Sequence, residues 1–335
     1  MIIPVKTTSG GYDIIFGEGI LEKIDTVLNL NRKVLVVTDD GVPSQYAKAV
    51  ADKSENAIII VLPQGEKSKN FQNYKKILDA LCECEFSRSD CVVAVGGGVV
   101  GDIAGFAAAT YMRGIDFYNI PTTVLSQVDS SIGGKTAIDF NGFKNIVGCF
   151  YQPTRVIVDT SLLKTLPPRQ ISNGLAEALK MALTHSEELF GIFKEGNIDQ
   201  ALSDIIGKSI LIKRQVVESD EKETGLRRVL NFGHTIGHAI ESNDGSLYHG
   251  ECVALGMLPM CSNDVKEQII PILKRLNLPV ETKVSADEII EKMKLDKKVS
   301  GGDITVVTVD KIGSFKLQKI SLCALEEKVR EVYSK

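Results

Sequence analysis

The first half of the chain alternates short runs of β-branched and other apolar residues with segments whose apolar residues have helical spacing. The strand-like runs are 33–38, 57–62, 91–95 and 116–120. Segments 70–84 and 99–110 are typical of helices that cross from one strand to the next. Short apolar strands that alternate with helices favour a parallel sheet with helices on its faces. The pattern therefore predicts an α/β fold with a Rossmann-like, doubly wound parallel sheet.

The pattern changes after two consecutive prolines, Pro167 and Pro168. The segments with helical spacing that follow are 171–185, 198–218, 235–242, 250–264 and 267–276. Only segment 303–317 returns to a hairpin-like pattern. A chain of 335 residues has the length of about two domains. We therefore expect an α/β domain at 1–166 and a mainly α-helical domain at 167–335.

Charge and hydropathy exclude several classes of protein. The chain has 39 basic and 43 acidic side chains and no basic tail, so we expect no nucleic-acid partner. Its longest aliphatic run, 57–62, is far shorter than the roughly 20 residues of a membrane span. Segment 1–11 lacks the charged start and apolar stretch of a secretory signal. The seven scattered cysteines are typical of reduced thiols in the cytoplasm, where we expect the protein.

A glycine-rich segment follows the third strand-like run. Gly96, Gly98 and Gly101 stand between an apolar strand and a helix, where backbone N–H groups can approach a phosphate without obstruction by Cβ atoms. Glycines also serve tight turns, so this spacing alone does not establish a nucleotide site. Two charged segments, 38–41 and 65–69, also follow strand-like runs, where ligands of open α/β sheets bind. Together the three segments favour nucleotide binding.

Three of the four histidines, His234, His238 and His249, fall within sixteen positions. His234 and His238 are four residues apart and share a helix face, and a turn-rich segment allows His249 to fold back. A catalytic zinc often takes two histidines and a carboxylate and keeps an open position for substrate. The candidate acids are Glu177, Glu241 and Glu251. Spacing alone does not choose the ligands among these side chains.

Polar side chains gather in segments 128–136 and 141–145, which show neither helical nor strand periodicity. We interpret this stretch as a long loop. Long loops with several lysines and glycines are often functional, and Lys135, Lys144 and Asn145 suit a phosphorylated or carboxylated substrate. Further cations are available at Arg113, Lys213 and Arg227. The residues indicate a metal- and nucleotide-dependent enzyme that acts on an anionic small molecule.

These features coincide with the motifs of a known family. The chain closely resembles the 3-dehydroquinate synthase family of sugar phosphate cyclases over most of its length. The motifs that carry the resemblance lie at 65–69, 96–102, 121–123, 129–135, 144–145, 173–177, 230–238 and 249–251. One position departs from the family's pattern, because Gln170 follows Arg169 where glutamate is expected. This departure makes an ion pair at that position doubtful.

The resemblance implies a zinc site, with Co²⁺ as a possible substitute. It assigns the metal to Glu177, His234 and His249, and it places His238 beside the metal as a catalytic residue or an outer partner. It also implies a homodimer, in which Arg113 reaches the substrate phosphate from the partner subunit.

The resemblance further implies that 1–166 binds NAD and that 167–335 binds metal and substrate. The residues implied for NAD are Asp39 or Asp40, Glu66, Lys69, Gly97, Gly98, Val99, Asp102, Thr122, Thr123, Lys135, Lys144 and Thr165. The implied substrate is 3-deoxy-D-arabino-heptulosonate 7-phosphate. The residues implied for it are Asp129, Lys135, Lys144, Asn145, Lys180, Lys213, Arg227, Asn231, His238 and one lysine of Lys297 and Lys298.

The activity that the resemblance implies is a carbon–oxygen lyase reaction of the shikimate pathway. NAD oxidises the C5 hydroxyl, phosphate is eliminated, the same nicotinamide returns the hydride, and the ring opens and closes again by an aldol step. Three alternatives are 2-deoxy-scyllo-inosose synthase, a zinc- or iron-dependent polyol dehydrogenase and a catalytically inactive binding protein. Segments 129–135 and 144–145 argue against the first two, and Arg227 also argues against the first. The complete catalytic set argues against the third.

Overall fold

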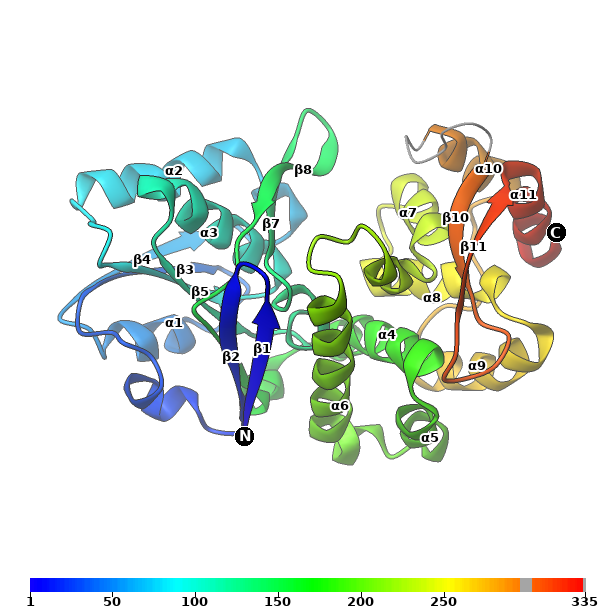
Figure 1. Ribbon diagram of the computed structural model, residues 1–335, viewed down its shortest axis with the longest axis horizontal. Helices are drawn as coiled ribbons and strands as arrows, with labels where there is room; N and C mark the ends of the chain where they lie inside the picture. The colour runs from blue at the N-terminus through cyan, green and yellow to red at the C-terminus, as the bar shows by residue number, and fades with distance from the viewer. Residues whose placement is uncertain (296–302, 334–335) are drawn as a thin grey trace. The chain divides into compact units, whose positions relative to one another are not determined.

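The contacts between Cα atoms divide the chain after Pro167, into the units Met1–Pro167 and Pro168–Lys335 (Figure 1). The structure is a computed structural model that describes residues 1–295 and 303–333. The first unit is built around a mostly parallel sheet, and the second is mainly helical. The predicted α/β fold class is confirmed.

Seven strands form the sheet of the first unit, in the order β1-β2-β9-β6-β5-β3-β4. They are β1 (Ile2–Thr7), β2 (Gly10–Gly17), β3 (Lys33–Asp39), β4 (Asn56–Leu62), β5 (Cys91–Gly96), β6 (Asp116–Pro121) and β9 (Arg155–Asp159). Only β1 and β2 are antiparallel, and every other neighbouring pair in this sheet is parallel. The four strands expected from apolar runs are confirmed as β3, β4, β5 and β6.

The sheet carries a hydrophobic core on each face. Its helices are α1 (Ser44–Ala51), α2 (Phe71–Glu83) and α3 (Gly98–Thr110), with shorter helical turns η1 (Leu21–Thr26), η2 (Glu66–Ser68), η3 (Tyr111–Arg113) and η5 (Thr160–Thr165). Along β3, Leu35 and Val37 pack toward α2 and α3, whereas Val34 and Val36 pack toward α1. Figure 1 shows α2 and α3 on one side of the sheet and α1 on the other. Because both faces are covered at the centre of the sheet, residues 34–37 of β3 and 91–95 of β5 form continuous apolar runs without polar alternation.

The strand order reverses next to β3. The chain crosses from β3 to β4 on one side and then returns to β5 on the other, so the carboxyl ends of β3 and β5 form a topological switch point. Ligands of open α/β sheets bind in the crevice at such a point. Asp39 ends β3 and Gly96 ends β5, so two of the segments expected to bind a nucleotide lie there.

The stretch that we interpret as a long loop is a β-hairpin, so that prediction is wrong. A π-helical turn at Ser126–Ser130 is followed by β7 (Lys135–Phe140) and β8 (Phe143–Phe150), which pair antiparallel. Asn141 and Gly142 join the strands with φ angles of 50° and 80°, and Asn-Gly is a strong signal for such a turn. Every residue of β8 is exposed, which explains why the strand lacks apolar and polar alternation.

The second unit is organised around α4 (Pro168–His185), which packs against α5, α6 and α8. The other helical segments are α5 (Glu187–Glu195), α6 (Ile198–Ser219), η6 (Leu226–Asn231), α7 (His234–Asn243), α8 (His249–Met257), η7 (Leu258–Met260), α9 (Asn263–Arg275), α10 (Ala286–Leu295) and α11 (Leu322–Tyr333). The expected hairpin is formed by β10 (Asp303–Thr308) and β11 (Lys316–Ser321).

One predicted helix, 250–264, is wrong at its C-terminal end. The helix α8 stops at Met257, and α9 begins only after Ser262. The Ser262 hydroxyl accepts a hydrogen bond from the Val265 N–H group, which is the contact of a helix N-cap. Within the described ranges, no helix is both long enough and apolar enough to cross a membrane.

Candidate active site

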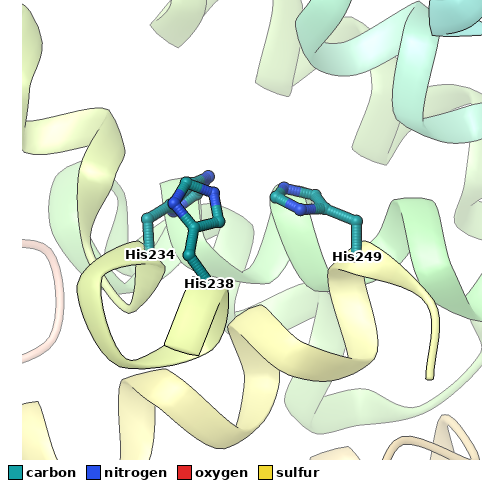
Figure 2. Close-up of side chains that lie close together, drawn as sticks. All are labelled: His234, His238 and His249. Atoms are coloured by element: carbon teal, nitrogen blue, oxygen red, sulfur yellow. The ribbon is translucent and has the colours of Figure 1, made fainter. Parts of the chain in front are cut away.

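Three histidine side chains meet in the second unit. His234 is the first residue of α7, His238 lies one turn further along the same helix, and His249 is the first residue of α8. Figure 2 shows the three rings turned toward one another across the gap between these two helices. Their centroids lie 5.2 to 5.7 Å apart, and one nitrogen from each ring lies within 4.8 Å of the others. The predicted clustering of the histidines is confirmed.

A buried carboxylate from α4 completes this cluster. Glu177 is only 1% exposed, and its Oε1 atom lies 3.8 Å from Nε2 of His234 and 3.5 Å from Nε2 of His249. Among the described residues, Oε1 accepts no hydrogen bond, although it is buried. The other carboxylate oxygen is paired with the Lys180 ammonium group. A buried carboxylate oxygen that faces two imidazole nitrogens fits the donor set of a divalent metal ion.

Charges around Glu177 determine which groups are ionised. Burial opposes ionisation of Glu177, but Lys180 and the two histidines outweigh it and hold the pKa of this carboxyl well below its usual range. Burial and the nearby Lys180 charge lower the pKa of His234 well below its usual value. Burial acts in the same direction on His249, but the carboxylates of Glu177 and Glu241 outweigh it and raise the pKa of this ring to about 9. At neutral pH, His234 therefore offers a free lone pair, whereas His249 holds a proton.

Binding of a divalent cation to the metal-free protein should displace that proton. Near pH 7.5 the protonated fraction of His249 is high, because its pKa is about 9, so we expect release of about one proton for each zinc bound. Calorimetric titrations with zinc in two buffers of different ionisation enthalpy measure this number. Glu241→Gln is the matched control, since it removes one carboxylate that raises the pKa and should reduce proton release. Equal release by both proteins would contradict the assignment.

Partners behind the rings fix their orientation. The Nδ1 atom of His234 lies 3.2 Å from the Phe232 carbonyl oxygen, and Nδ1 of His249 lies 3.5 Å from Glu241 Oε2. In both rings the other nitrogen, Nε2, faces Glu177. In metal sites, a histidine ligand likewise binds the metal through one nitrogen and an outer acceptor through the other. Of the three candidate acids, Glu177 lies inside the cluster and Glu241 behind it. Glu251 instead accepts two hydrogen bonds from Arg169.

The cations and amides assigned to substrate in this unit are buried or already hydrogen-bonded. Lys180, Lys213 and Arg227 are each at most 5% exposed. The Asn231 side chain donates to Glu223 Oε1 at 2.7 Å. Because α4 packs against both α6 and η6, the fold brings the segments of these residues together, and Lys180 directly contacts Glu177 of the metal cluster. The other assigned lysines, Lys297 and Lys298, lie outside the described residues.

In the first unit, the glycine-rich turn approaches its neighbours too closely for side chains. A Cβ atom at Gly96 would lie 2.6 Å from Val100 Cγ2, and one at Gly98 would lie 3.0 Å from Ser130 Oγ. Helix α3 begins at Gly98, with Val99 in its first turn, and its N-cap residue Gly97 has no side chain that could cap the N-terminal amides. Uncapped amides at a helix N-terminus are a binding site for phosphate groups.

The carboxylates at the carboxyl end of β3 already accept backbone hydrogen bonds. Asp39 Oδ1 accepts from Gly41 N–H at 2.9 Å, and Asp40 Oδ1 accepts from Gln64 N–H at 2.7 Å. Burial raises the pKa of Asp39 despite these contacts. Each carboxylate has a second oxygen, and Asp40 is exposed, so the pair still fits an interaction with ribose hydroxyls.

A buried lysine links three segments of the first unit. Lys69 is 4% exposed and donates to Asp102 on α3 and to Asn145 on the β7–β8 hairpin, while Glu66 Oε1 lies 4.0 Å from its ammonium group. Burial raises the pKa of Asp102 even though Lys69 acts in the opposite direction. Asn145, which the sequence assigns to substrate, therefore accepts a hydrogen bond from Lys69, which is assigned to NAD.

The remaining assigned residues of this unit are distributed around the same loops. Thr122 N–H donates to the Gly96 carbonyl, and Thr123 Oγ1 lies 2.8 Å from Ser126 Oγ. The others are Asp129 in the π-helical turn, exposed Lys135 and Lys144 on the hairpin, Thr165 beside Tyr46, and exposed Arg113 at the end of η3. The structure thus places the residues assigned to NAD near the strand ends, except for those on the hairpin.

Comparisons with known proteins agree with both halves of this description. A family model described as the N-terminal part of 3-dehydroquinate synthase matches residues 59–173, and the model of the C-terminal part matches residues 174–299. The chain belongs to the 3-dehydroquinate synthase family. The resemblance inferred from the motifs is thereby confirmed.

Curated members of the 3-dehydroquinate synthase family are similar over nearly the whole chain. A protein of that name from Campylobacter concisus is 41% identical over 325 residues, which cover 92% of each chain. One from Ruminiclostridium cellulolyticum is 43% identical over 328 residues, which cover 90% of each chain.

Solved structures of other sugar phosphate cyclases share the fold of this 3-dehydroquinate synthase family member. A 2-deoxy-scyllo-inosose synthase complexed with carbaglucose-6-phosphate, NAD+ and Co2+ is 25% identical, with a TM-score of 0.89 over 99% of this chain and all of that chain. The 2-epi-5-epi-valiolone synthase of Streptomyces hygroscopicus is 24% identical, with a TM-score of 0.87 over 99% of both chains.

Sequence reasoning missed one ion pair of this family member. The Gln170 departure makes an ion pair doubtful at its own position, but the sequence does not indicate that the neighbouring Arg169 pairs with Glu251 through two hydrogen bonds of 2.7 Å. Glu251 also accepts from Tyr248 N–H, so it closes a capping box at the start of α8. The available signal was a glutamate three residues after the N-cap, which is the spacing of that box.

Proposed function

We propose that this chain is a 3-dehydroquinate synthase, a lyase that converts 3-deoxy-D-arabino-heptulosonate 7-phosphate into 3-dehydroquinate and phosphate. The family assignment over both halves of the chain supports this activity. The observation that carries it is the buried Glu177 oxygen beside His234 and His249, because this donor set fits the divalent metal that the reaction needs. Two imidazoles and one carboxylate also leave coordination positions for substrate hydroxyls.

NAD is the proposed redox cofactor, and when bound it takes a hydride from the substrate and returns it later in the same turnover. The amides of Gly97 and Gly98 suit its pyrophosphate, because α3 begins there without a side-chain cap. Carboxylates at Asp39 and Asp40 suit its ribose hydroxyls. The full proposed set is Asp39, Asp40, Glu66, Lys69, Gly97, Gly98, Val99, Asp102, Thr122, Thr123, Lys135, Lys144 and Thr165.

Zinc or cobalt is the proposed metal, and when bound it supplies a Lewis acid that makes a substrate hydroxyl more acidic. Glu177, His234 and His249 hold the ion in this proposal. His238 is exposed beside these ligands, so its ring can exchange a proton with the substrate. The Lys180 ammonium group keeps the buried Glu177 carboxylate ionised in the metal-free protein.

The substrate phosphate is proposed to bind to exposed cations. Lys135 and Lys144 project from the β7–β8 hairpin, and Arg113 would reach the phosphate from the partner subunit of a homodimer. The other proposed substrate contacts are Asp129, Asn145, Lys180, Lys213, Arg227, Asn231, His238 and one lysine of Lys297 and Lys298. Seven free thiols suit the cytoplasm, which is the proposed location.

A single assay tests this function. The protein is supplied with the heptulosonate phosphate, NAD and zinc, and phosphate, dehydroquinate and NADH absorbance are followed together. We expect equal amounts of phosphate and dehydroquinate and no accumulation of NADH, because one nicotinamide takes and returns the hydride. Stoichiometric NADH would instead indicate a polyol dehydrogenase. Glucose 6-phosphate is the matched control substrate, and its cyclisation in place of the heptulosonate would indicate a deoxy-inosose synthase.

A further inference from the structure

One face of α4 runs along the beginning of α8. Arg169, Asn173 and Glu177 follow one another at intervals of four residues, which places them on the same side of α4. Glu177 faces His249, Asn173 accepts a hydrogen bond from Gly250 N–H at 2.6 Å, and Arg169 is paired with Glu251. Three successive turns of α4 thus contact three successive residues of α8.

The Arg169 contact holds the segment that carries His249 at several points. Its guanidinium donates to both Glu251 oxygens at 2.7 Å and to the Ser246 carbonyl at 2.7 Å. It also lies over the Tyr248 ring, 4.1 Å from the centroid. Paired hydrogen bonds between arginine and carboxylate fix orientation as well as distance. The residues on both sides of His249 are therefore tied to one side chain of α4.

The Asn173 contact sets how closely α4 and α8 approach. A Cβ atom at Gly250 would lie 2.0 Å from the Asn173 carbonyl oxygen, so the two backbones meet where no side chain fits. Asn173 is 8% exposed, and its side-chain oxygen accepts the Gly250 N–H group at this point. The hydrogen bond fixes the position of the α8 backbone one residue away from His249.

Capping of α8 alone does not explain why Arg169 is paired with Glu251. Glu251 accepts the Tyr248 N–H group with one of its own oxygens, so α8 has its N-terminal cap without Arg169. What Arg169 adds is a fixed connection from this cap to the helix that carries Glu177. Metal sites need ligands held within about 0.5 Å of their productive positions by neighbouring hydrogen bonds.

We propose that Arg169 and Asn173 are positioning residues, which hold His249 at the distance from Glu177 at which both side chains bind one metal ion. This inference rests on the metal site of the proposed function. It adds that the site's affinity depends on two residues that do not touch the metal.

Zinc affinity of the metal-free protein, measured by competition with a chromophoric chelator, tests the proposal without substrate or NAD. Arg169→Lys keeps the charge but cannot form the paired hydrogen bonds, so we expect zinc binding to weaken about 10- to 100-fold, the range for outer partners of metal ligands. Asn173→Ala should weaken it similarly. Asn173→Asp keeps the acceptor oxygen and should retain most of the affinity. Arg330→Lys, in the Arg330–Asp287 pair of the same unit, is the matched control and should bind zinc normally.

Cobalt spectra separate positioning from loss of folding. At saturating Co²⁺, Arg169→Lys should show altered ligand-field bands while circular dichroism remains that of the folded protein. Glu251→Gln provides a second variant, since it weakens the same pair from the other side. Unchanged zinc affinity and cobalt spectra in Arg169→Lys, Glu251→Gln and Asn173→Ala would overturn the positioning role but leave the metal site intact. Failure of the unchanged protein to bind zinc would overturn the proposed metal site itself.

Discussion

His249→Ala and Glu177→Ala should each lose zinc and activity together, whereas His238→Ala should keep about one zinc per chain and lose about 10²- to 10⁴-fold in kcat, the range for a general acid or base. The reason is geometric. The buried Glu177 oxygen lies 3.8 Å from His234 and 3.5 Å from His249, while His238 is exposed. Metal content after dialysis, measured with kcat on the same samples, checks the expectation.

Two outcomes decide between this ligand set and a site of three histidines. The histidine nitrogens lie within 4.8 Å of one another, so a three-histidine site has the required spacing. Zinc retained by Glu177→Ala and lost from His238→Ala would show that the three rings are the ligands. His185→Gln is the matched control, because His185 lies outside the cluster with its ring 5.3 Å from that of Phe315. This variant should keep its metal.

The parts of the fold that were predictable are those with a strong local pattern. Residues 34–37 of β3 and 91–95 of β5 are all apolar because both faces of the sheet are covered there, so each run predicts a buried strand. β8 is exposed along its whole length and carries no such pattern. The π-helical turn and this hairpin depend on local backbone conformation at a few residues, of which only Asn141-Gly142 gave a usable signal.

The residues of the candidate site also differ in whether a local sequence pattern predicts their proximity. His234 and His238 are near each other because they are four residues apart on one helix, which the sequence alone predicts. Glu177 lies some sixty residues earlier on another helix, so its choice over Glu241 and Glu251 required either the family resemblance or the packing of α4 against α8. The ion pair between Arg169 and Glu251 likewise depends on the packing of α4 against α8. Contacts between distant segments leave no periodic signal in the chain.

Lys180→Met should lower the free energy of unfolding of the metal-free protein by about 3–5 kcal/mol, the scale for removing one partner of a buried ion pair. Lys180 and Glu177 are both only 1% exposed, so the substitution leaves a carboxylate buried beside fewer positive charges. Urea unfolding measures the loss. Lys75→Met is the matched control, because Lys75 pairs with Asp79 at the surface and should give no measurable change.

The loss of unfolding free energy in Lys180→Met should depend on pH and on zinc in a defined direction. In the unchanged protein the pKa of Glu177 is held well below 4.5, so this carboxylate contributes stability above its unfolded pKa and loses that contribution as pH falls through the folded pKa. Without Lys180, burial raises this pKa, so the variant gains stability on protonation and the difference from the unchanged protein shrinks as pH falls. Zinc should narrow the difference in stability between the two proteins at neutral pH, because a cation beside Glu177 replaces the missing charge.

Glu177→Gln in combination with Lys180→Met removes the buried charge altogether and should be more stable than Lys180→Met alone. A double variant that is less stable than Lys180→Met would show that the lost stability comes from packing of the lysine stem and not from the unpaired carboxylate.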